Sequence, residues 1–341
     1  MRNLPLRWGV SLPTRGVLFG LTSVDTLMEA AVLAEESGVF ESVWFGDSLI
    51  HKPRLESVVM LGAVAARTRT VRLGIMCLAS FPVRHPVLLA IQWATLDQIS
   101  KGRTVLAVCI GGGHEPELRA FGVKQEERVG RLKEGISLLR KLWSAEEVNH
   151  RGRFYTLEGY RIHPKPIQQP PPIWIAVSPD REKVGDRVVD QAMRRVGTMA
   201  DGYITMGVTT QEFRRRWKVI ESAAAEAGRD LTNFETSIHG MVNINDKKQA
   251  AYEESKFYFS HYYSPGYPTE GLLRLWLAHG RPEECAKLIQ SWIDMGITTP
   301  VLRFTSHDQL GQIHRFIDEV IPLLQWNHGK GSTEGERRSH V

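Results

Sequence analysis

The stretch VRLGIMCLASFPVRHPVLLAIQWATLDQISKGRTVLAVCIGGG, residues 71–113, decides the fold class. It holds two short apolar runs, VRLGIMCL and TVLAVCI, on either side of a segment with helical character at 86–100. Nearly continuous apolar character is expected of a strand whose two faces are both covered. A strand, a helix and a second strand in this order predict a parallel βα unit.

The same alternation continues along the chain. Strands are predicted at 7–12, 42–45, 71–78, 104–110, 173–177, 202–205, 236–244 and 299–304. Apolar stripes of helical period or helix-start signals predict helices at 23–37, 56–67, 86–100, 129–142, 186–199, 210–227, 282–295 and 310–324. Eight units without a break in composition favour one closed (β/α)8 TIM barrel of the α/β class over an open doubly wound sheet, and 341 residues suit it.

Three segments depart from this repeat. Residues 150–172 are proline-rich and form an excursion before the fifth strand, with a short hairpin predicted at GRFYTLEGYRI. Residues 246–280 form an extended, aromatic-rich insertion between strands 7 and 8, much longer than an ordinary βα loop. Residues 327–341 are polar and aperiodic, which predicts a barrel domain over 1–326 and a disordered tail after it.

Composition limits the function classes. Apolar residues make up 42% and charged residues 24%, as in compact globular proteins. No apolar run approaches the roughly 18 residues of a membrane span, and the N-terminus does not resemble a signal peptide. The three cysteines are too few and too scattered for a disulfide framework, so a cytoplasmic location is expected.

A formal net charge of +5 raises the question of a nucleic-acid partner. The consecutive arginines at 214–216 lie in a predicted helix, however, and no recognised module or interleaved aromatic residues accompany them. We therefore expect no nucleic-acid partner and no membrane partner. A milder consequence of the charge is a preference for an anionic cofactor or substrate.

Ligands of a barrel bind at the C-terminal ends of its strands, so the residues that follow each strand are the candidates for the site. After the second strand, Asp47 and Ser48 can orient a ring or relay a proton, or they can simply cap a turn or helix. After the third strand, Met76, Cys77 and Ala79 offer a small, soft surface to a flat ring, with ordinary core packing as the alternative for Cys77.

The fourth strand is followed by Gly111, Gly112 and Gly113, which leave the main chain open to a ligand. His114 and Glu117 then bring titratable groups to the mouth of the pocket. The spacing lacks the GxGxxG pattern of a dinucleotide site, and a plain loop is the alternative interpretation.

After the fifth strand, Ser178 and Arg181 precede a helix whose free amides suit a phosphate, although Arg181 can equally be solvent-exposed. His239, in the seventh strand, is interpreted as a core histidine and left out of the catalytic set. The sequence contains no metal-ligand spacing, GxSxG elbow or Walker loop, so we predict no metal site and neither a hydrolase nor a phosphotransferase.

Several longer phrases carry a resemblance to a known family. They are SVWFGDS, ARTRTVRLGIMCLAS, RHPVLLAIQWATLDQISKGRTVLAVCIGGG, ELRAFGV, LLRKLW, PPIWIAV and GRPEECAKLIQSWIDMGI. In order and spacing they resemble the bacterial luciferase-like monooxygenase family, from about residue 6 to about residue 324. The resemblance implies a barrel with an extended insertion that binds FMN or coenzyme F420 at the C-terminal ends of its strands.

The resemblance also implies roles for individual residues. Asp47 and Ser48 would lie near the ring system, and Met76 and Cys77 would form a bulge against which the ring leans. Ser178 falls where the family holds the cofactor's polar chain or phosphate. The chain departs from the family's pattern at Ser48, where many F420-using relatives have histidine.

Two further positions differ from the usual family sequence. His114 falls where the family often has tryptophan or glutamate, and the turn from Ser178 to Arg181 replaces a shorter glycine-rich turn. We predict His114, Asp47 and Glu117 as the catalytic residues.

The implied activity is that of an oxidoreductase supplied with reduced cofactor by a separate flavin or F420 reductase. With reduced FMN and O2 it would oxygenate a small organic substrate, while the aromatic insertion excludes water. With F420 it would transfer hydride, and His114 or Glu117 would supply the proton. Ser48 slightly favours FMN as the cofactor, and F420 is the alternative. A further alternative is a flavin-binding protein without catalytic activity. A homodimer is also expected, and the insertion's tyrosines can line the pocket, the core or the dimer interface.

Overall fold

The computed structural model describes residues 4–263 and 267–326. In these residues eight parallel strands close into a barrel, in the order β11-β1-β2-β3-β4-β7-β8-β9 and back to β11. They are β1 Trp8–Leu12, β2 Phe40–Phe45, β3 Arg72–Leu78, β4 Thr104–Val108, β7 Ile173–Ala176, β8 Gly202–Thr205, β9 Glu235–Ile244 and β11 Thr299–Phe304. The predicted barrel and all eight predicted strands are confirmed.

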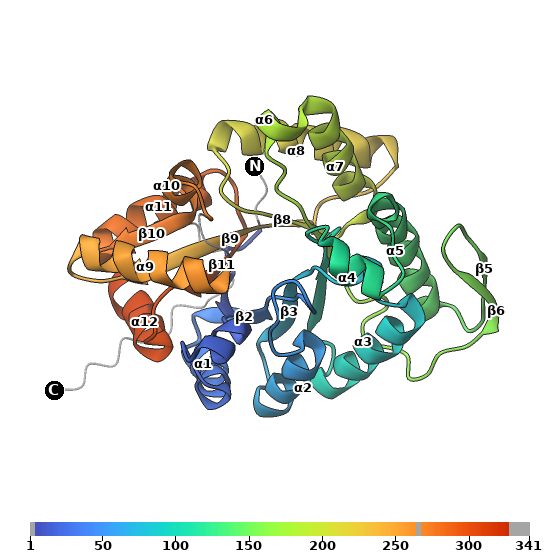
Figure 1. The fold of residues 1–341 in the computed structure, drawn as a ribbon, viewed down its shortest axis with the longest axis horizontal. Helices are drawn as coiled ribbons and strands as arrows, with labels where there is room; N and C mark the ends of the chain where they lie inside the picture. Colours follow the sequence, from blue (N-terminus) through green and yellow to red (C-terminus); the bar gives the residue numbers. More distant parts are fainter. Residues whose placement is uncertain (1–3, 264–266, 327–341) are drawn as a thin grey trace.

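Helices surround these strands (Figure 1). The main ones are α1 Val24–Glu36, α2 Ser57–Arg67, α3 Pro86–Ser100, α5 Arg128–Ser144, α7 Asp186–Met199, α8 Thr210–Glu226, α11 Pro282–Asp294 and α12 Gln309–Arg315. Their starts follow from the sequence: the Oγ of Ser23 accepts a hydrogen bond from the Thr26 amide before α1, and Pro86 and Pro282 occupy first-turn positions. The last predicted helix is α-helical only over α12 and continues as a π-turn and a 3-10 turn at Phe316–Val320 and Ile321–Leu323.

Glycines make room for two indole rings inside the barrel. A Cβ atom on Gly74 would lie 2.1 Å from the ring of Trp44, and one on Gly202 would lie 2.6 Å from the ring of Trp174. Both indoles are buried, and their centroids are 5.4 Å apart. Because these rings fill the interior, a ligand can enter only the mouth of the barrel.

An ion pair joins the N-terminal ends of β3 and β9. The Nη1 and Nη2 atoms of Arg72 donate to Oε1 and Oε2 of Glu235 at 2.6 and 2.8 Å, and the Thr299 hydroxyl donates to Oε2 at 2.6 Å. Burial alone would raise the pKa of the Glu235 carboxyl, but the bonds from Arg72 outweigh it and lower that pKa. The closed end of the barrel is therefore held by a charged pair.

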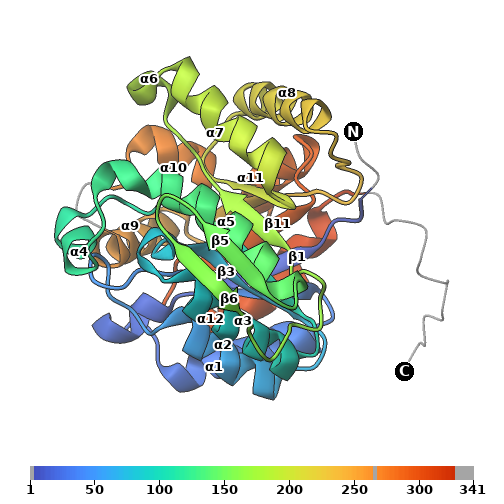
Figure 2. The ribbon, with the colours of Figure 1, turned by 90° about the vertical axis from the view of Figure 1, so that its right-hand side faces the viewer.

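The segments at 150–172 and 246–280, which depart from the βα repeat, differ in part from their predicted structure. The hairpin pairs β5 Val148–Arg151 with β6 Thr156–Tyr160, so its first strand begins upstream of the predicted stretch; it lies on the outer side of the barrel (Figures 1 and 2). The insertion at 246–280 contains α9 Lys248–Tyr262, α10 Glu270–Trp276 and a ninth strand, β10 Leu277–Gly280, which pairs with β9.

Shorter helices and the chain end complete the description. Helices α4 Glu115–Ala120 and α6 Arg181–Val184, and the 3-10 turns Thr14–Phe19, Phe81–Val83 and Gln125–Glu127, follow strands or connect helices and were not predicted. The predicted disordered tail at 327–341 lies outside the described residues. No helix in the described part of the chain is long and apolar enough to cross a membrane.

Candidate active site

A cleft of about 370 Å³ opens at the C-terminal ends of the barrel strands. The segments after β2, β3 and β4 form one part of its wall, and the rest comes from β9, β11, the residue after β8 and the C-terminal end of α9. Its volume suits a small-molecule site. A second hollow of about 380 Å³ lies against α4 and the turn that follows it, and none of the predicted site residues lines it.

Most of the predicted site residues come together in this cleft. Those that line it are Asp47, Ser48, Met76, Cys77, Ala79, Gly111, Gly112, His114 and Glu117. Ser178 and Arg181 do not line it. The structure therefore places one predicted cluster at the exits of three neighbouring strands, and the chemical role of each residue stays a prediction.

The glycine run forms a rim without side chains. Gly111 and Gly113 have positive φ angles of 71° and 69°, which favour glycine. A Cβ atom on Gly111 would lie 2.5 Å from the Ala79 carbonyl oxygen, so the loop after β4 passes directly against the loop after β3. On Gly112 a Cβ atom would meet nothing nearer than His51 Cδ2 at 3.9 Å. The glycine run is therefore packed against the loop after β3, and its conformation depends on glycine.

Asp47 ties the exits of β2 and β3 together. Its carboxylate is buried and accepts hydrogen bonds from the amide and hydroxyl of Ser80, at 2.8 and 2.6 Å, and from the Ser57 hydroxyl at 3.2 Å. Arg84 pairs with it at 3.3 Å. Ser48 lines the cleft and also accepts a hydrogen bond from the Lys52 amide, so the turn-capping interpretation holds for its hydroxyl.

Glu117 and His114 come from the loop and helix that follow the glycine rim. The Oε2 atom of Glu117 accepts hydrogen bonds from the amides of Ile50 and His51 at 2.7 and 2.8 Å, which fixes the loop after β2. The rings of His51 and His114 lie 4.3 Å apart between centroids. Desolvation, and then the neighbouring His114, lower the pKa of His51. The Nδ1 atom of His114 is buried and has no hydrogen-bond partner in the described residues.

The predicted bulge is present where β3 ends. The register between β3 and β4 shifts between Ile75 and Leu78, and the Met76–Cys77 peptide bond is cis. The bulge brings the free thiols of Cys77 and Cys109 together, with 2.8 Å between their Sγ atoms. Sequence spacing gave no sign of this contact, because Cys77 lies on β3 and Cys109 directly follows β4.

His239 is the cleft residue that sequence reasoning set aside. It lies on β9, lines the cleft, and its Nε2 atom is buried without a hydrogen-bond partner in the described part of the chain. Desolvation, with a smaller effect of Arg303, lowers its pKa well below the ordinary value, so the imidazole is neutral. Its alternation with Ser237 and Met241 along β9 was the available signal, since one face of a barrel strand points inward.

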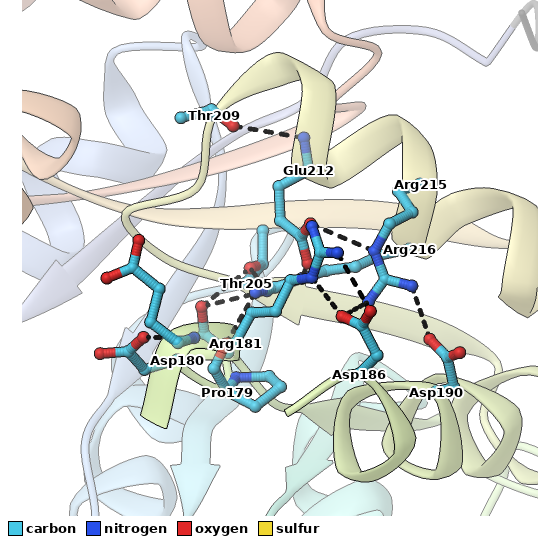
Figure 3. Close-up of polar contacts among 12 residues, drawn as sticks. Pro179, Asp180, Arg181, Asp186, Asp190, Thr205, Thr209, Glu212, Arg215 and Arg216 are labelled. Carbon is cyan, nitrogen blue, oxygen red and sulfur yellow. Dashed lines mark hydrogen bonds and ion pairs between the residues drawn. The ribbon is translucent and has the colours of Figure 1, made fainter. Parts of the chain in front are cut away.

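Arg181 belongs to a separate polar network (Figure 3), which Ser178 joins through Thr205 and Arg216. Arg181 donates through Nε and Nη2 to the carboxylate of Asp186. Ser178 donates to the Met206 carbonyl at 2.7 Å, and the buried Arg216 pairs with Glu212 at 2.9 Å. The arginines of this network already have carboxylate partners, so the predicted phosphate contact of Arg181 would require it to leave Asp186.

The sequence model described as luciferase-like monooxygenase matches residues 6–299 of this chain. The chain belongs to the luciferase-like monooxygenase family. Membership confirms the resemblance found in the sequence and the prediction of an oxidoreductase.

Two curated relatives within the family align over most of the chain. The F420-dependent glucose-6-phosphate dehydrogenase of Nakamurella multipartita is 28% identical over 332 residues, which cover 89% of this chain and 94% of that protein. The protein of the same name from Rhodococcus erythropolis is 26% identical over 330 residues, covering 88% of this chain and 93% of that one.

Solved structures of other proteins share the fold. An F420-dependent secondary alcohol dehydrogenase in complex with an F420-acetone adduct has a TM-score of 0.76 at 21% identity, over 94% of this chain and 100% of that chain. Monooxygenase RslO1 from Streptomyces bottropensis also has a TM-score of 0.76, at 22% identity, over 93% and 99% of the two chains. At these identities the likeness establishes the barrel of the luciferase-like monooxygenase family and no more.

The cleft fits the flat redox ring that the family resemblance implies. The rim at Gly111–Gly113 carries no side chains, and Met76 and Ala79 leave a shallow, soft surface beside it. Two histidines that line the cleft, His114 and His239, each have a buried ring nitrogen, Nδ1 and Nε2 respectively, without a hydrogen-bond partner among the described residues. The described residues contain no group of three or more His, Cys, Asp or Glu that could hold a metal ion.

Proposed function

We propose that this protein is an F420-dependent oxidoreductase that transfers hydride between the deazaflavin and a small organic substrate. The observation that carries the proposal is the open glycine rim of a cleft lined by two histidines, each with a ring nitrogen that has no hydrogen-bond partner in the part of the chain that the structure describes. The relatives named above are F420-dependent dehydrogenases that align along nearly their whole length, and they support F420 over the reduced FMN that Ser48 suggested.

The protein's own residues would prepare the site for this chemistry. F420, when bound, supplies a ring carbon that accepts or releases a hydride. Gly111, Gly112 and Met76 would seat the ring, while Asp47 holds the two strand exits in register. His114, which lines the cleft, would exchange the substrate proton through its imidazole. Glu117 would act with His114 or through the loop that it fixes.

The tyrosines of α9 would close the opposite side of the cleft. Tyr262 and Tyr263 line it, and Tyr262 is fully buried. Such a wall excludes water, which strengthens the polar interactions inside and protects a hydride in transit.

A monooxygenase that uses reduced FMN and O2 is the second candidate. Ser48 favours it, because its hydroxyl lines the cleft at a position where many F420-using relatives carry histidine. The separate reductase, the small-molecule substrate and the homodimer predicted from the sequence remain part of either proposal.

Titration of the purified protein with F420 and FMN, each oxidised and reduced, tests the two candidates by absorbance and fluorescence. We expect F420 to bind at micromolar concentration and FMN at least tenfold more weakly. Tighter binding of reduced FMN, with substrate oxidation that requires O2, would establish the second candidate. If neither cofactor binds at micromolar concentration in any oxidation state, both candidates are wrong.

A further inference from the structure

Three cationic side chains line the cleft and a fourth lies near one of them; we name the four the cation group: Arg15, Lys52, Arg54 and Arg303. Lys52, Arg54 and Arg303 line the cleft, in the loop after β2 and on β11. Arg15 lies in the turn after β1, where desolvation and then the neighbouring Arg54 lower its pKa. The β11, β1 and β2 strands are adjacent in the barrel, so the cation group occupies one continuous arc of its mouth.

The cation group has no carboxylate to balance it. Among the residues at 4–263 and 267–326, none of its members forms an ion pair with Asp or Glu. Their partners are neutral: Arg54 Nη1 donates to the Tyr262 hydroxyl at 3.2 Å, and Arg303 donates to the hydroxyl and carbonyl of Ser11. The Nε and Nη1 atoms of Arg15 are buried without a hydrogen-bond partner in the described chain.

Several other arginines of this protein have carboxylate partners. Arg72 pairs with Glu235, Arg84 with Asp47, and the buried Arg216 with Glu212. Figure 3 shows such a balanced network around Arg216. An unbalanced group of cations is costly in a desolvated site, because like charges repel and each has lost part of its hydration. An anion that enters the cleft would relieve both effects.

Tyr262 and Tyr263, at the C-terminal end of α9, contact members of the cation group. The Arg303 guanidinium lies over the ring of Tyr262, 4.8 Å from its centroid, and Lys52 lies over Tyr263 at 5.3 Å. Burial alone would raise the pKa of Tyr262, but Arg303 and Arg54 outweigh it and lower that pKa. The pKa of the neighbouring Tyr263 is raised, because burial there outweighs the effect of Arg303. These rings therefore offer the cations aromatic faces rather than a counter-charge.

We propose that the cation group binds an anionic substituent of the substrate, a phosphate or a carboxylate. The proposal rests on the proposed function, which places the redox ring at the exits of β3 and β4. The cation group lies on the neighbouring arc, so an anion held there would extend the rest of the substrate over the ring. The cofactor's own phosphate is a second possible source of an anion, but the family resemblance puts it at Ser178, after β7 and beyond β4.

Isothermal titration of the cofactor-free protein with inorganic phosphate and with succinate tests the proposal, with sodium chloride at equal ionic strength as the reference. We expect saturable binding of at least one anion. Arg54→Gln should weaken that binding about tenfold, since one charge-assisted contact is lost. Lys52→Gln, at a half-exposed position, should act in the same direction and guards against a folding defect in the first variant. Arg214→Gln, at an exposed position on α8, is the matched control and should bind as the wild type does.

F420 titrations of the same variants identify the source of the anion. If the anion belongs to the substrate, Arg54→Gln binds F420 as the wild type does while its phosphate or succinate affinity falls. Loss of F420 affinity in Arg54→Gln would assign the cation group to the cofactor and overturn the proposal. Absence of saturable anion binding, or equal affinity in Arg54→Gln and the wild type, would also overturn it. A failure of F420 to bind the wild type would refute the proposed function and leave the anion titrations unaffected.

Discussion

Replacement of Gly111 by alanine should damage both the stability of the protein and its cofactor site. The φ angle of 71° costs an alanine roughly 1–2 kcal/mol. The added Cβ atom would lie 2.5 Å from the Ala79 carbonyl oxygen, and because that atom is backbone, one of two packed loops must move, at a cost of about 1–3 kcal/mol. The free energy of unfolding should therefore fall by about 3 kcal/mol.

Differential scanning calorimetry measures this change. With an unfolding entropy of about 2.1 cal/mol/K per residue, a loss of about 3 kcal/mol corresponds to a Tm decrease of about 4 °C for a chain of this length. Gly112→Ala is the matched control, because its Cβ atom would meet only His51 Cδ2 at 3.9 Å. This control should keep the wild-type Tm within about 1 °C.

Cofactor binding separates the two variants further. A methyl group on Gly112 would project from the rim without disturbing the fold, so F420 affinity should fall about tenfold while Tm is unchanged. A Tm for Gly111→Ala within about 1 °C of the wild-type value would refute the close approach of the two loops. Unchanged F420 affinity in Gly112→Ala would refute the seating of the ring on this rim.

Three further substitutions test other parts of the structure. Glu235→Gln should lower the free energy of unfolding by about 1.5–3 kcal/mol at pH 7 in urea titrations, because it removes the counter-charge of the half-buried Arg72. Since the folded-state pKa of Glu235 lies below its ordinary 4.5, the stability from this pair is present above pH 4.5 and is lost as the pH falls through the lowered pKa. The difference in unfolding free energy between variant and wild type should therefore shrink in that pH range. A difference that does not change with pH would contradict the ion pair as its source. His114→Ala should reduce turnover with F420 by about 10²–10⁴-fold at unchanged F420 affinity, and intact turnover would show that its predicted role is wrong. Glu117→Gln should weaken two charge-assisted bonds to the loop after β2 by about 1.5–3 kcal/mol in total, seen as faster hydrogen exchange at the Ile50 amide; unchanged exchange would exclude this positioning role.

Local sequence signals predicted the strands well and the insertion poorly. The eight barrel strands are short apolar runs buried on both faces. The composition of each run predicts that it is buried, even when its neighbouring strands are unknown. Helices α9 and α10 were not predicted because aromatic side chains lie around much of α9, which hides a helical stripe. The hairpin was displaced because Val148–Arg151 carries little strand signal and pairs only with its own neighbour, β6.

The residues of the candidate site were also predicted only in part from the sequence. The residues after the second, third and fourth strands were predicted from their position alone, because every parallel strand of a barrel delivers its following loop to the same end. Arg181 was chosen by the same rule, yet it pairs with Asp186 outside the cleft. His239 was set aside because an isolated histidine in an apolar strand resembles a core residue, and only the closed barrel shows that this residue lines the cleft, with an Nε2 atom that has no partner among the described residues.

The sequence by itself determined the barrel, its order of strands and helices, and the glycine rim, because burial, helical period and backbone freedom are properties of short segments. Only the tertiary structure decided which distant side chains meet. It brought Cys77 to Cys109, and it placed Arg15 and Arg303, from distant parts of the chain, on neighbouring strands or their loops, where no described Asp or Glu pairs with either of them. The physical reason is that the sequence around a charged residue or a cysteine does not show which distant residue it will contact. Those contacts depend on how the barrel closes and on the register of its strands.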